Sequence, residues 1–285
     1  GYRGWLESTA NLEMTGGVDD DDINLILEDA LDDRIDPSDV MVVPHHTGIG
    51  FGLCDPGHLA DSERAPIIEI YSHHGQSEYY APQHALSYEF NRFRHPERRS
   101  PNSVNGRHYA QDFWEAGHRM GVICSSDDHS GRPGRPMNGV TAVQTEELDQ
   151  ESIYDALWNR RCYGTTGERL LMDFELGAAQ MGEVIETTGG EQFDGSLEVW
   201  GTDVLITVEI LEQSPETNGF EPIVQQSPYD SPSAVEDATP EAMQASIEFS
   251  VDPAADAMYY ARVTQCPVEW PAMAWSSPIW IDSET

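Results

Sequence analysis

The sequence of 285 residues contains no lysine. Its fifteen basic residues are all arginines, and fifty-one aspartates and glutamates bring the formal net charge to −36. A surface this acidic repels polyanions, which argues against nucleic acids and anionic membranes as partners. Such a chain also repels itself in dilute buffer, whereas molar salt shortens the screening length to about 3 Å. The composition predicts a protein adapted to a very salty medium, with the cytoplasm of a high-salt organism as its expected location.

Long apolar runs and the common metal or disulfide motifs are also missing. No stretch approaches the ~18 apolar residues of a membrane helix, and the first residues lack the order of a signal peptide. The four cysteines are widely spaced and form no C-x-x-C pair, which argues against a zinc finger or a disulfide framework. No D-x-D-x-D-G calcium loop is present. We therefore expect buried free thiols and no membrane partner.

Histidine is absent from the second half of the chain. All ten histidines lie between His45 and His129. This asymmetry predicts two regions, residues 1–166 with the histidines and residues 167–285 without them. In the first region strand-like and helix-like segments alternate, which is typical of a parallel α/β sheet or barrel. In the second region short β-branched and aromatic segments, separated by turn residues, predict an antiparallel, sandwich-like β-rich region.

The elements of the first region are predicted from apolar periodicity. Strands are expected at 40–44, 66–71, 121–126 and 139–144, and helices near 23–31, at 107–119 and at 149–161. Gly121 is the expected stop of the second helix, and Asp149 is the expected N-cap of the third. In the second region the polar stretch 213–241 is predicted to be a long surface loop.

Three of the predicted strands end in residues of the kind that bind metal ions: His45 and His46, His73 and His74, and Asp127 and His129. Strand ends of an α/β barrel converge on one face, so these side chains are expected to lie close together. Asp127 and His129 should point to the same side of an extended segment, because the strand period is two. Imidazoles and carboxylates suit Zn²⁺, Mn²⁺ or Fe²⁺. The pattern predicts a metal site.

Two arginines follow the last of these motifs. Arg132 and Arg135 are candidates for binding an anionic substrate, because guanidinium groups match phosphate oxygens. In a chain without lysine, the same arginines also serve as ordinary surface cations. No role is assigned to the other five histidines: His58, His84, His95, His108 and His118.

Several longer motifs resemble the DUF3604 family of the PHP (polymerase and histidinol phosphatase) superfamily of metal-dependent phosphoesterases. These motifs are PHHTG, EIYSHHGQSE, SSDDHSGRPG, RRCYGTTGERLLMDF and AWSSPIWI. The resemblance implies a distorted (β/α)7 barrel, present whole or as its C-terminal part, followed by an antiparallel β-rich extension. It also implies two or three divalent metal ions. The superfamily's opening H-x-H strand is absent, so either a longer chain supplies it or the metal cluster is incomplete.

The resemblance also suggests roles for single residues. It favours His46 as a ligand with His45 close by, and His74 with His73 as the alternate. Glu69 becomes a bridging or outer carboxylate. The D-x-H motif is carried over to Asp127 and to His129.

The expected activity is metal-assisted hydrolysis of a small phosphate ester. Asp127, His129 and His46 would hold metal, and His74 would complete the site or act as an acid near the leaving oxygen. Two alternatives stay open: hydrolysis of amides or sulfate esters, and a degenerate barrel that binds a ligand without catalysis. The sequence leaves the substrate, the metal and the oligomeric state undetermined.

Overall fold

The structure is a computed structural model that describes residues 41–50, 52–59, 64–87, 102–128, 131, 138–227, 239–253, 255–266 and 272–283. The chain divides into two compact units. The first comprises Gly1–Ile70 and His74–Met120, and the second comprises Tyr71–His73 and Gly121–Thr285. The division predicted between residues 166 and 167 is drawn from the sequence alone and stays a prediction.

The first unit, where the structure describes it, is built from short elements. These are the 3₁₀ helices η3 (Pro56–His58) and η5 (Ala85–Ser87), the strand β2 (Gly75–Gln76) and the helix α4 (Ala110–Glu115). The strand predicted at 40–44 is not formed, because residues 41–44 have no regular structure. The carbonyl of Pro44 nevertheless accepts a hydrogen bond from the N–H of Glu69 at 2.9 Å. The helix predicted near 23–31 lies outside the described residues.

The helix α4 is shorter than the sequence pattern predicts. Its C-terminus is closed by a pair of backbone bonds, from the N–H of Gly117 to the carbonyl of Trp114 and from the N–H of His118 to the carbonyl of Phe113, both at 3.0 Å. This is a Schellman motif with glycine in the left-handed conformation, φ 92° at Gly117. The predicted stop at Gly121 is therefore wrong, since that residue begins a strand.

A three-stranded sheet with the order β2–β1–β3 contains the strands predicted at 66–71 and 121–126. β1 spans Ile67–Ser72 and β3 spans Gly121–Cys124. Every residue of both strands is buried. Burial at every position, as opposed to every second one, is typical of strands covered on both faces.

The rest of the second unit is dominated by strands. The larger sheet consists of β4 (Val140–Val143), β5 (Cys162–Thr165), β8 (Val184–Thr187), β10 (Leu205–Gln213), β11 (Glu221–Gln226), β13 (Ala257–Gln265), β14 (Ala272–Ser276) and β15 (Ile279–Ser283). The smaller sheet consists of β6 (Leu171–Leu176), β7 (Ala179–Gln180), β9 (Phe193–Trp200) and β12 (Gln244–Val251). The helices are α5 (Gln150–Trp158) and the 3₁₀ turn η8 (Pro240–Met243). β11 falls within the stretch predicted to be a loop at 213–241, and η8 begins at its end, so that prediction is wrong in part.

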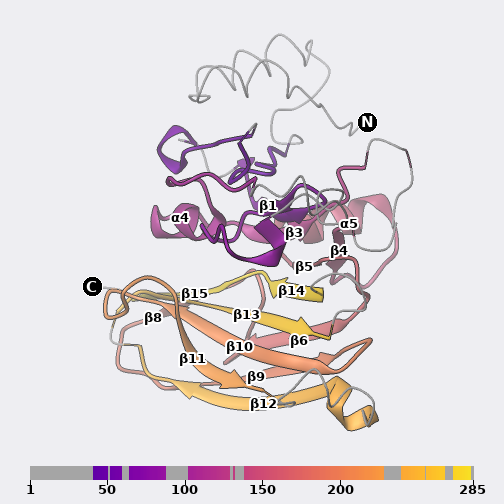
Figure 1. The fold of residues 1–285 in the computed structure, drawn as a ribbon. Coiled ribbons are helices and arrows are strands. Elements are labelled where there is room, and N and C mark those ends of the chain that lie inside the picture. Colours follow the sequence, from indigo (N-terminus) through magenta and orange to yellow (C-terminus); the bar gives the residue numbers. More distant parts are fainter. Residues whose placement is uncertain are drawn as a thin grey trace. The chain divides into compact units, whose positions relative to one another are not determined.

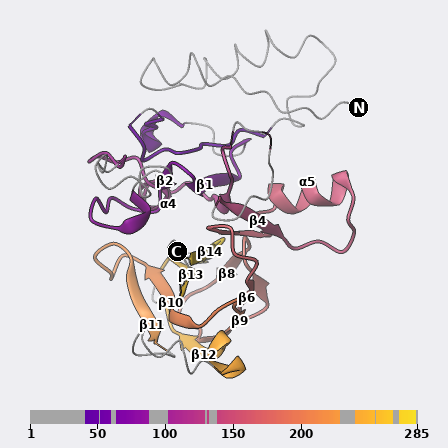
Figure 2. The same cartoon turned by 45° about the vertical axis from the view of Figure 1, so that its right-hand side comes forward.

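The two sheets form a sandwich, seen as two layers in Figures 1 and 2. The smaller sheet has the order β12–β9–β6–β7, and the larger runs β11–β10–β13–β14–β5–β4, with β15 paired to β13 and β8 paired to β15. In β6 the residues Met172, Phe174 and Leu176 are buried, whereas Asp173 is exposed. This alternation is the period-two pattern of a strand with one face in the core.

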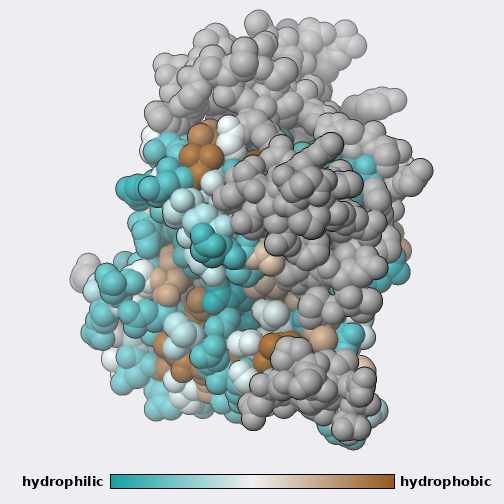
Figure 3. All heavy atoms as spheres, viewed as in Figure 1, coloured by the Kyte–Doolittle hydropathy of each residue, from teal (hydrophilic) through white to brown (hydrophobic). Residues whose placement is uncertain are grey.

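One hydrophobic core joins both sheets. It includes Phe174 and Leu197 from the smaller sheet and Ile210 and Val263 from the larger, all with 0% of their surface exposed. Burying side chains of this size is the main favourable contribution to folding, roughly 1.5–3 kcal/mol for each. On the face shown in Figure 3, the described surface is mainly hydrophilic and apolar residues occur in small groups.

The predicted (β/α)7 barrel is wrong, because the described strands form β-rich sheets with largely antiparallel pairing. The decisive element is α5, which was expected to connect parallel strands. β4 and β5, on either side of α5, pair antiparallel, with Val140 opposite Thr165 and Val143 opposite Cys162. The helix lies in the connection between two antiparallel neighbouring strands, so it is not the crossover helix of a β–α–β unit. Neither α-helix in the described ranges is long enough to cross a membrane.

Candidate metal centre

Two segments that follow neighbouring strands carry the candidate ligands. β1 and β3 are adjacent in their sheet, and just beyond β3 the N–H of Ser125 donates to the carbonyl of Tyr71 at 3.0 Å. Two residues further along each segment stand His73 and Asp127. Sheet pairing therefore brings an imidazole and a carboxylate together from distant parts of the sequence.

The strand β3 is held in place by two hydroxyl groups. The fully buried Ser277 accepts from the N–H of Val122 at 2.8 Å and donates to the carbonyl of Cys162 at 2.6 Å. The hydroxyl of Thr141 accepts from the N–H of Cys124 at 3.1 Å and donates to the carbonyl of the same residue at 2.7 Å. Paired donors and acceptors of this kind satisfy buried backbone groups and fix a strand end.

A glycine permits the close approach of the next strand. A Cβ atom added at Gly139 would lie 2.3 Å from the carbonyl oxygen of Ser125, far inside van der Waals contact. Any other residue at this position would push β4 away from the segment that carries Asp127. The spacing around that segment therefore depends on the missing side chain.

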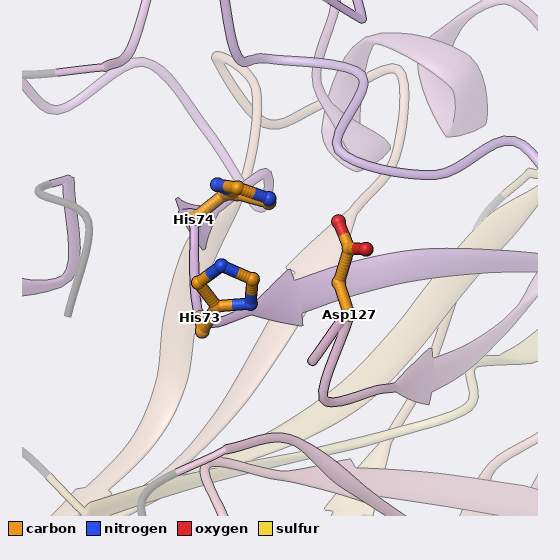
Figure 4. Close-up of side chains that lie close together, drawn as sticks. All are labelled: His73, His74 and Asp127. Carbon is orange, nitrogen blue, oxygen red and sulfur yellow. The ribbon is translucent and has the colours of Figure 1, made fainter. Parts of the chain in front are cut away.

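Three side chains form a group that can hold a metal ion. His73, His74 and Asp127 each offer one ligand atom, and these atoms lie within 4.8 Å of one another. His73 and Asp127 belong to the second unit, and His74, which follows His73 directly in the chain, is counted with the first. Figure 4 shows both imidazoles on the segment after β1, with the carboxylate of Asp127 beside them. All three residues are half-buried, so the group is reachable from solvent.

Asp127 has an unusual backbone conformation. Its φ of 44° lies in the left-handed region, which is uncommon for residues other than glycine although aspartate tolerates it. The expectation that Asp127 and His129 share one side of an extended segment is wrong at its first residue, because Asp127 is not extended. His46, another predicted ligand, also has a positive φ, at 38°.

The remaining candidates from the N-terminal motif lie in the first unit. The imidazole of His46 contacts those of His45 and His74, with ring centroids 4.0 and 5.9 Å apart. The N–H of His46 donates to the carboxylate of Glu69 at 3.1 Å, and both residues are buried. His45, His46 and Glu69 are not part of the three-residue group, and their predicted roles stay predictions.

The last part of the predicted site is the segment after Asp128. His129, Arg132 and Arg135 lie outside the described residues. Their roles as a ligand and as anion-binding groups stay predictions.

Two other histidines and one cysteine have local surroundings that the structure describes. His118 and His108 lie within hydrogen-bond distance of the carbonyls of Pro56 and Cys54, at 2.9 and 3.3 Å. Burial, helped by the neighbouring Asp55 carboxylate, raises the pKa of the Cys54 thiol to about 11. Because metals bind the thiolate, this environment disfavours Cys54 as a ligand.

A separate cavity of about 270 Å³ lies in the second unit. Its lining includes the carboxylates of Glu212, Glu216 and Asp252 beside Ile223 and Tyr259. The hydroxyl of Tyr259 donates to Glu212 at 3.2 Å, and burial followed by the charge of Glu212 raises the pKa of this tyrosine. Its described lining residues include no histidine, so this lining differs in chemistry from the histidine group.

Sequence comparison finds relatives in chlamydiae. Proteins called uncharacterized in Chlamydia muridarum (strain MoPn / Nigg) and Chlamydia trachomatis serovar D are 37% and 35% identical to this chain over 148 residues. The match covers 50% of this chain and 22% of each relative, so the aligned part spans about a fifth of the relatives' length. No family model matches the chain.

Structural comparison gives weak likenesses only. A chitin binding domain from Burkholderia pseudomallei matches 35% of this chain and 56% of its own, at 14% identity and a TM-score of 0.25. An AA10 lytic polysaccharide monooxygenase from Streptomyces lividans matches 34% and 58%, at 12% identity and a TM-score of 0.21. The PmoD soluble domain from Methylocystis sp. ATCC 49242 (Rockwell) matches 39% of this chain and 90% of its own, at 9% identity and a TM-score of 0.24. At these TM-scores the likenesses carry no inference about function.

The assignment to the DUF3604 family and the PHP superfamily is therefore wrong on these findings. No family model supports it, and the strands form a β-rich arrangement instead of the barrel that the assignment implies. What remains is the group of His73, His74 and Asp127, which was reached from strand ends and is present in the structure.

Proposed function

We propose that this chain is a metal-dependent hydrolase that acts on small phosphate esters. The observation that carries the proposal is the group of two imidazoles and one carboxylate with ligand atoms within 4.8 Å of one another. Three protein ligands leave positions for water and substrate, which is the arrangement of catalytic as opposed to structural zinc sites. The half-burial of the three residues supports access for a small molecule.

The donor set fits a divalent transition metal ion. Imidazole nitrogens and a carboxylate oxygen suit Zn²⁺, Mn²⁺ and Fe²⁺, whereas calcium and magnesium prefer oxygen ligands alone. His73, His74 and Asp127 would hold one ion. A second or third ion would need further ligands, for which His45, His46 and His129 are the candidates.

The chain's own residues define what this site contributes. When bound, a divalent ion supplies Lewis acidity toward a phosphoryl oxygen and a nucleophile at neutral pH. His73 and Asp127 present their donors from segments anchored by the pairing of β1 and β3, so the ligands are held before the ion arrives. Preorganised ligands lose less conformational entropy on binding, which favours a mononuclear site even without further histidines.

The test begins with metal binding. The full chain, stripped with EDTA, should bind about one equivalent of Zn²⁺ or Mn²⁺ in calorimetry. His73→Ala should weaken binding by more than the roughly 10–100-fold typical of losing an outer partner of a ligand. His118→Ala is the matched control, because its imidazole meets a backbone carbonyl outside the group; it should bind metal like the parent chain.

The second arm measures hydrolysis. The metal-loaded chain should hydrolyse p-nitrophenyl phosphate, lose the activity with EDTA, and regain it when metal is returned. If p-nitrophenyl sulfate or an acyl p-nitroanilide is turned over faster, the proposed substrate class changes from phosphate esters to sulfate esters or amides. Metal binding without turnover of any of the three would contradict the hydrolase and leave a metal-binding protein.

A further inference from the structure

The imidazole of His73 makes one short contact that defines its chemistry. Its Nδ1 lies 2.7 Å from the backbone carbonyl oxygen of Ser126. A carbonyl oxygen can only accept a hydrogen bond, so Nδ1 must carry the hydrogen. The ring is thereby fixed both in orientation and in the position of its proton.

This proton position decides which nitrogen can bind a metal ion. A neutral imidazole has one N–H and one lone pair, and the hydrogen bond made by the first nitrogen selects the second as ligand. With Nδ1 donating to Ser126, the lone pair of His73 resides on Nε2. Metal-binding histidines are commonly held by such a bond to a backbone carbonyl or a carboxylate.

The residue that supplies this carbonyl is joined to another ligand. Ser126 directly precedes Asp127, and its hydroxyl accepts a hydrogen bond from the N–H of Asp128 at 3.3 Å. This bond spans the left-handed turn at Asp127, where φ is 44°. The side chain of Ser126 therefore braces the turn that presents the carboxylate, while its backbone orients the imidazole.

We propose that Ser126 is the positioning residue of the metal centre: its carbonyl commits His73 to bind through Nε2, and its hydroxyl braces the turn that presents Asp127. The inference rests on the proposed function for the identity of the ligand, a divalent metal ion. The orientation of His73 is a property of the metal-free chain and can be measured separately. Ser126 is not recognisable from the sequence, because a backbone carbonyl leaves no trace in residue type.

The first experiment reads the tautomer directly. Long-range ¹H–¹⁵N correlation spectra of the metal-free full chain at pH 8.5, assigned with His73→Gln, should show His73 protonated at Nδ1. His118 is an internal control of the opposite kind, because its Nε2 faces a backbone carbonyl at 2.9 Å and should carry the proton. A proton on Nε2 of His73, or an even mixture of both forms, would overturn the inference.

The second experiment tests the hydroxyl with zinc alone as the probe. Ser126→Ala should weaken Zn²⁺ binding about 10-fold, the lower end of the effect of outer partners of metal ligands. Ser126→Thr retains the hydroxyl and should restore binding to within about 3-fold of the parent chain. Loss of affinity in both variants, or in neither, would contradict the role of the hydroxyl.

The two experiments separate this inference from the proposed function. A proton on Nδ1 of His73 together with no zinc binding would uphold the orientation and end the metal-centre proposal. Zinc binding by a chain whose His73 carries its proton on Nε2 would uphold the metal centre and end the role of Ser126. Zinc binding without hydrolysis leaves the role of Ser126 intact and removes only the enzymatic assignment.

Discussion

At the scale of single residues, the β-rich part of the chain depends on very few cations. Arg262 is the only basic residue after Arg169 in the sequence. It lies on β13 opposite Glu209 on β10, with Nε 2.8 Å from the carboxylate oxygen Oε2. Gln225 on β11 donates to the other carboxylate oxygen of Glu209 at 3.2 Å. One arginine therefore neutralises a largely buried acid in the middle of three paired strands.

We predict that Arg262→Met lowers the free energy of unfolding by about 3 kcal/mol, because it leaves Glu209 buried without its positive partner. The measurement is urea unfolding followed by circular dichroism. Arg161→Met is the control, since Arg161 pairs with Asp155 through more exposed side chains and should cost at most about 1 kcal/mol. Equal losses in the two variants would contradict the argument.

The thiol of Cys162 gives the second prediction at this scale. Burial raises its pKa to about 12, against smaller opposing effects from the hydroxyl of Ser277 and the charge of Arg160. The thiol of the unfolded chain has a pKa of about 8.5. Below that pH the thiol is neutral in both the folded and the unfolded chain, and the folded state has its full stability. As the pH rises from about 8.5 toward the pKa of the folded chain, the thiol ionises in the unfolded chain alone, and the stability of the folded state falls progressively.

We therefore expect the parent chain to lose stability between pH 7 and pH 10, and Cys162→Ala to lose less over the same interval. The difference should be about 2 kcal/mol, since ionisation of the unfolded thiol contributes roughly 1.4 kcal/mol per pH unit above its pKa. Urea midpoints of the two proteins at both pH values measure it. Parallel losses would show that Cys162 ionises in the folded chain as readily as in the unfolded one.

At the scale of secondary-structure elements, the end of α4 is a test of local backbone chemistry. Gly117 has φ 92°, and a Cβ added there would meet no atom within 4 Å. Substitution should therefore act through backbone strain alone. We predict that Gly117→Ala costs about 1 kcal/mol in the free energy of unfolding, and that Gly117→Asn costs less because asparagine tolerates this conformation. Urea unfolding of both variants measures which substitution costs more. If a steric clash decided the cost, the larger asparagine would be the more destabilising of the two.

Many single elements were predictable from the sequence, because short apolar runs and helix-capping residues are local properties of the chain. The strands predicted at 66–71, 121–126 and 139–144 overlap β1, β3 and β4. The predicted N-cap Asp149 accepts a hydrogen bond from the N–H of Ser152 at 2.8 Å at the start of α5. What failed was the assembly, since the pairing of β4 with β5 is set by contacts that strand and helix patterns leave open.

The metal centre was half predictable for a related reason. Polar residues directly after buried strands are visible in sequence. This signal led to the pair His73 and His74, of which His74 was preferred and His73 kept as the alternate, and to Asp127 together with His129, which lies outside the described residues. The partners of those strands are not visible, so His45 and His46 were placed beside them with equal weight. The segment before His45 is not a strand, and these histidines stand outside the three-residue group.

At the scale of the whole molecule, the excess of acids extends into the pairing of strands. Asp173 on β6 and Glu198 on β9 are direct cross-strand partners. Like charges in such a pair oppose sheet formation. The Ser246 hydroxyl donates to Glu198 and the Gln144 side chain donates to Asp173 at 3.5 Å, so both carboxylates accept from neutral groups. Repulsion of this kind is relieved by screening, which connects the sheet to the net charge of −36.

We predict that the thermal midpoint rises steeply with potassium chloride up to about 1 M, where the Debye length has fallen from roughly 10 Å to about 3 Å. Glu198→Gln removes one member of the cross-strand pair and keeps a side chain that can still accept from Ser246. It should raise the midpoint at 0.1 M salt by about 1–3 °C, a shift that corresponds to less than about 1 kcal/mol in a chain of this size. The gain should shrink at 1 M, because the charge that the substitution removes is already screened there.

Glu147→Gln, at an exposed position outside the strands, between β4 and α5, is the matched control for removing one negative charge from the total. Equal gains from the two substitutions would assign the salt response to net charge, and a midpoint independent of salt would contradict an adaptation to a salty medium.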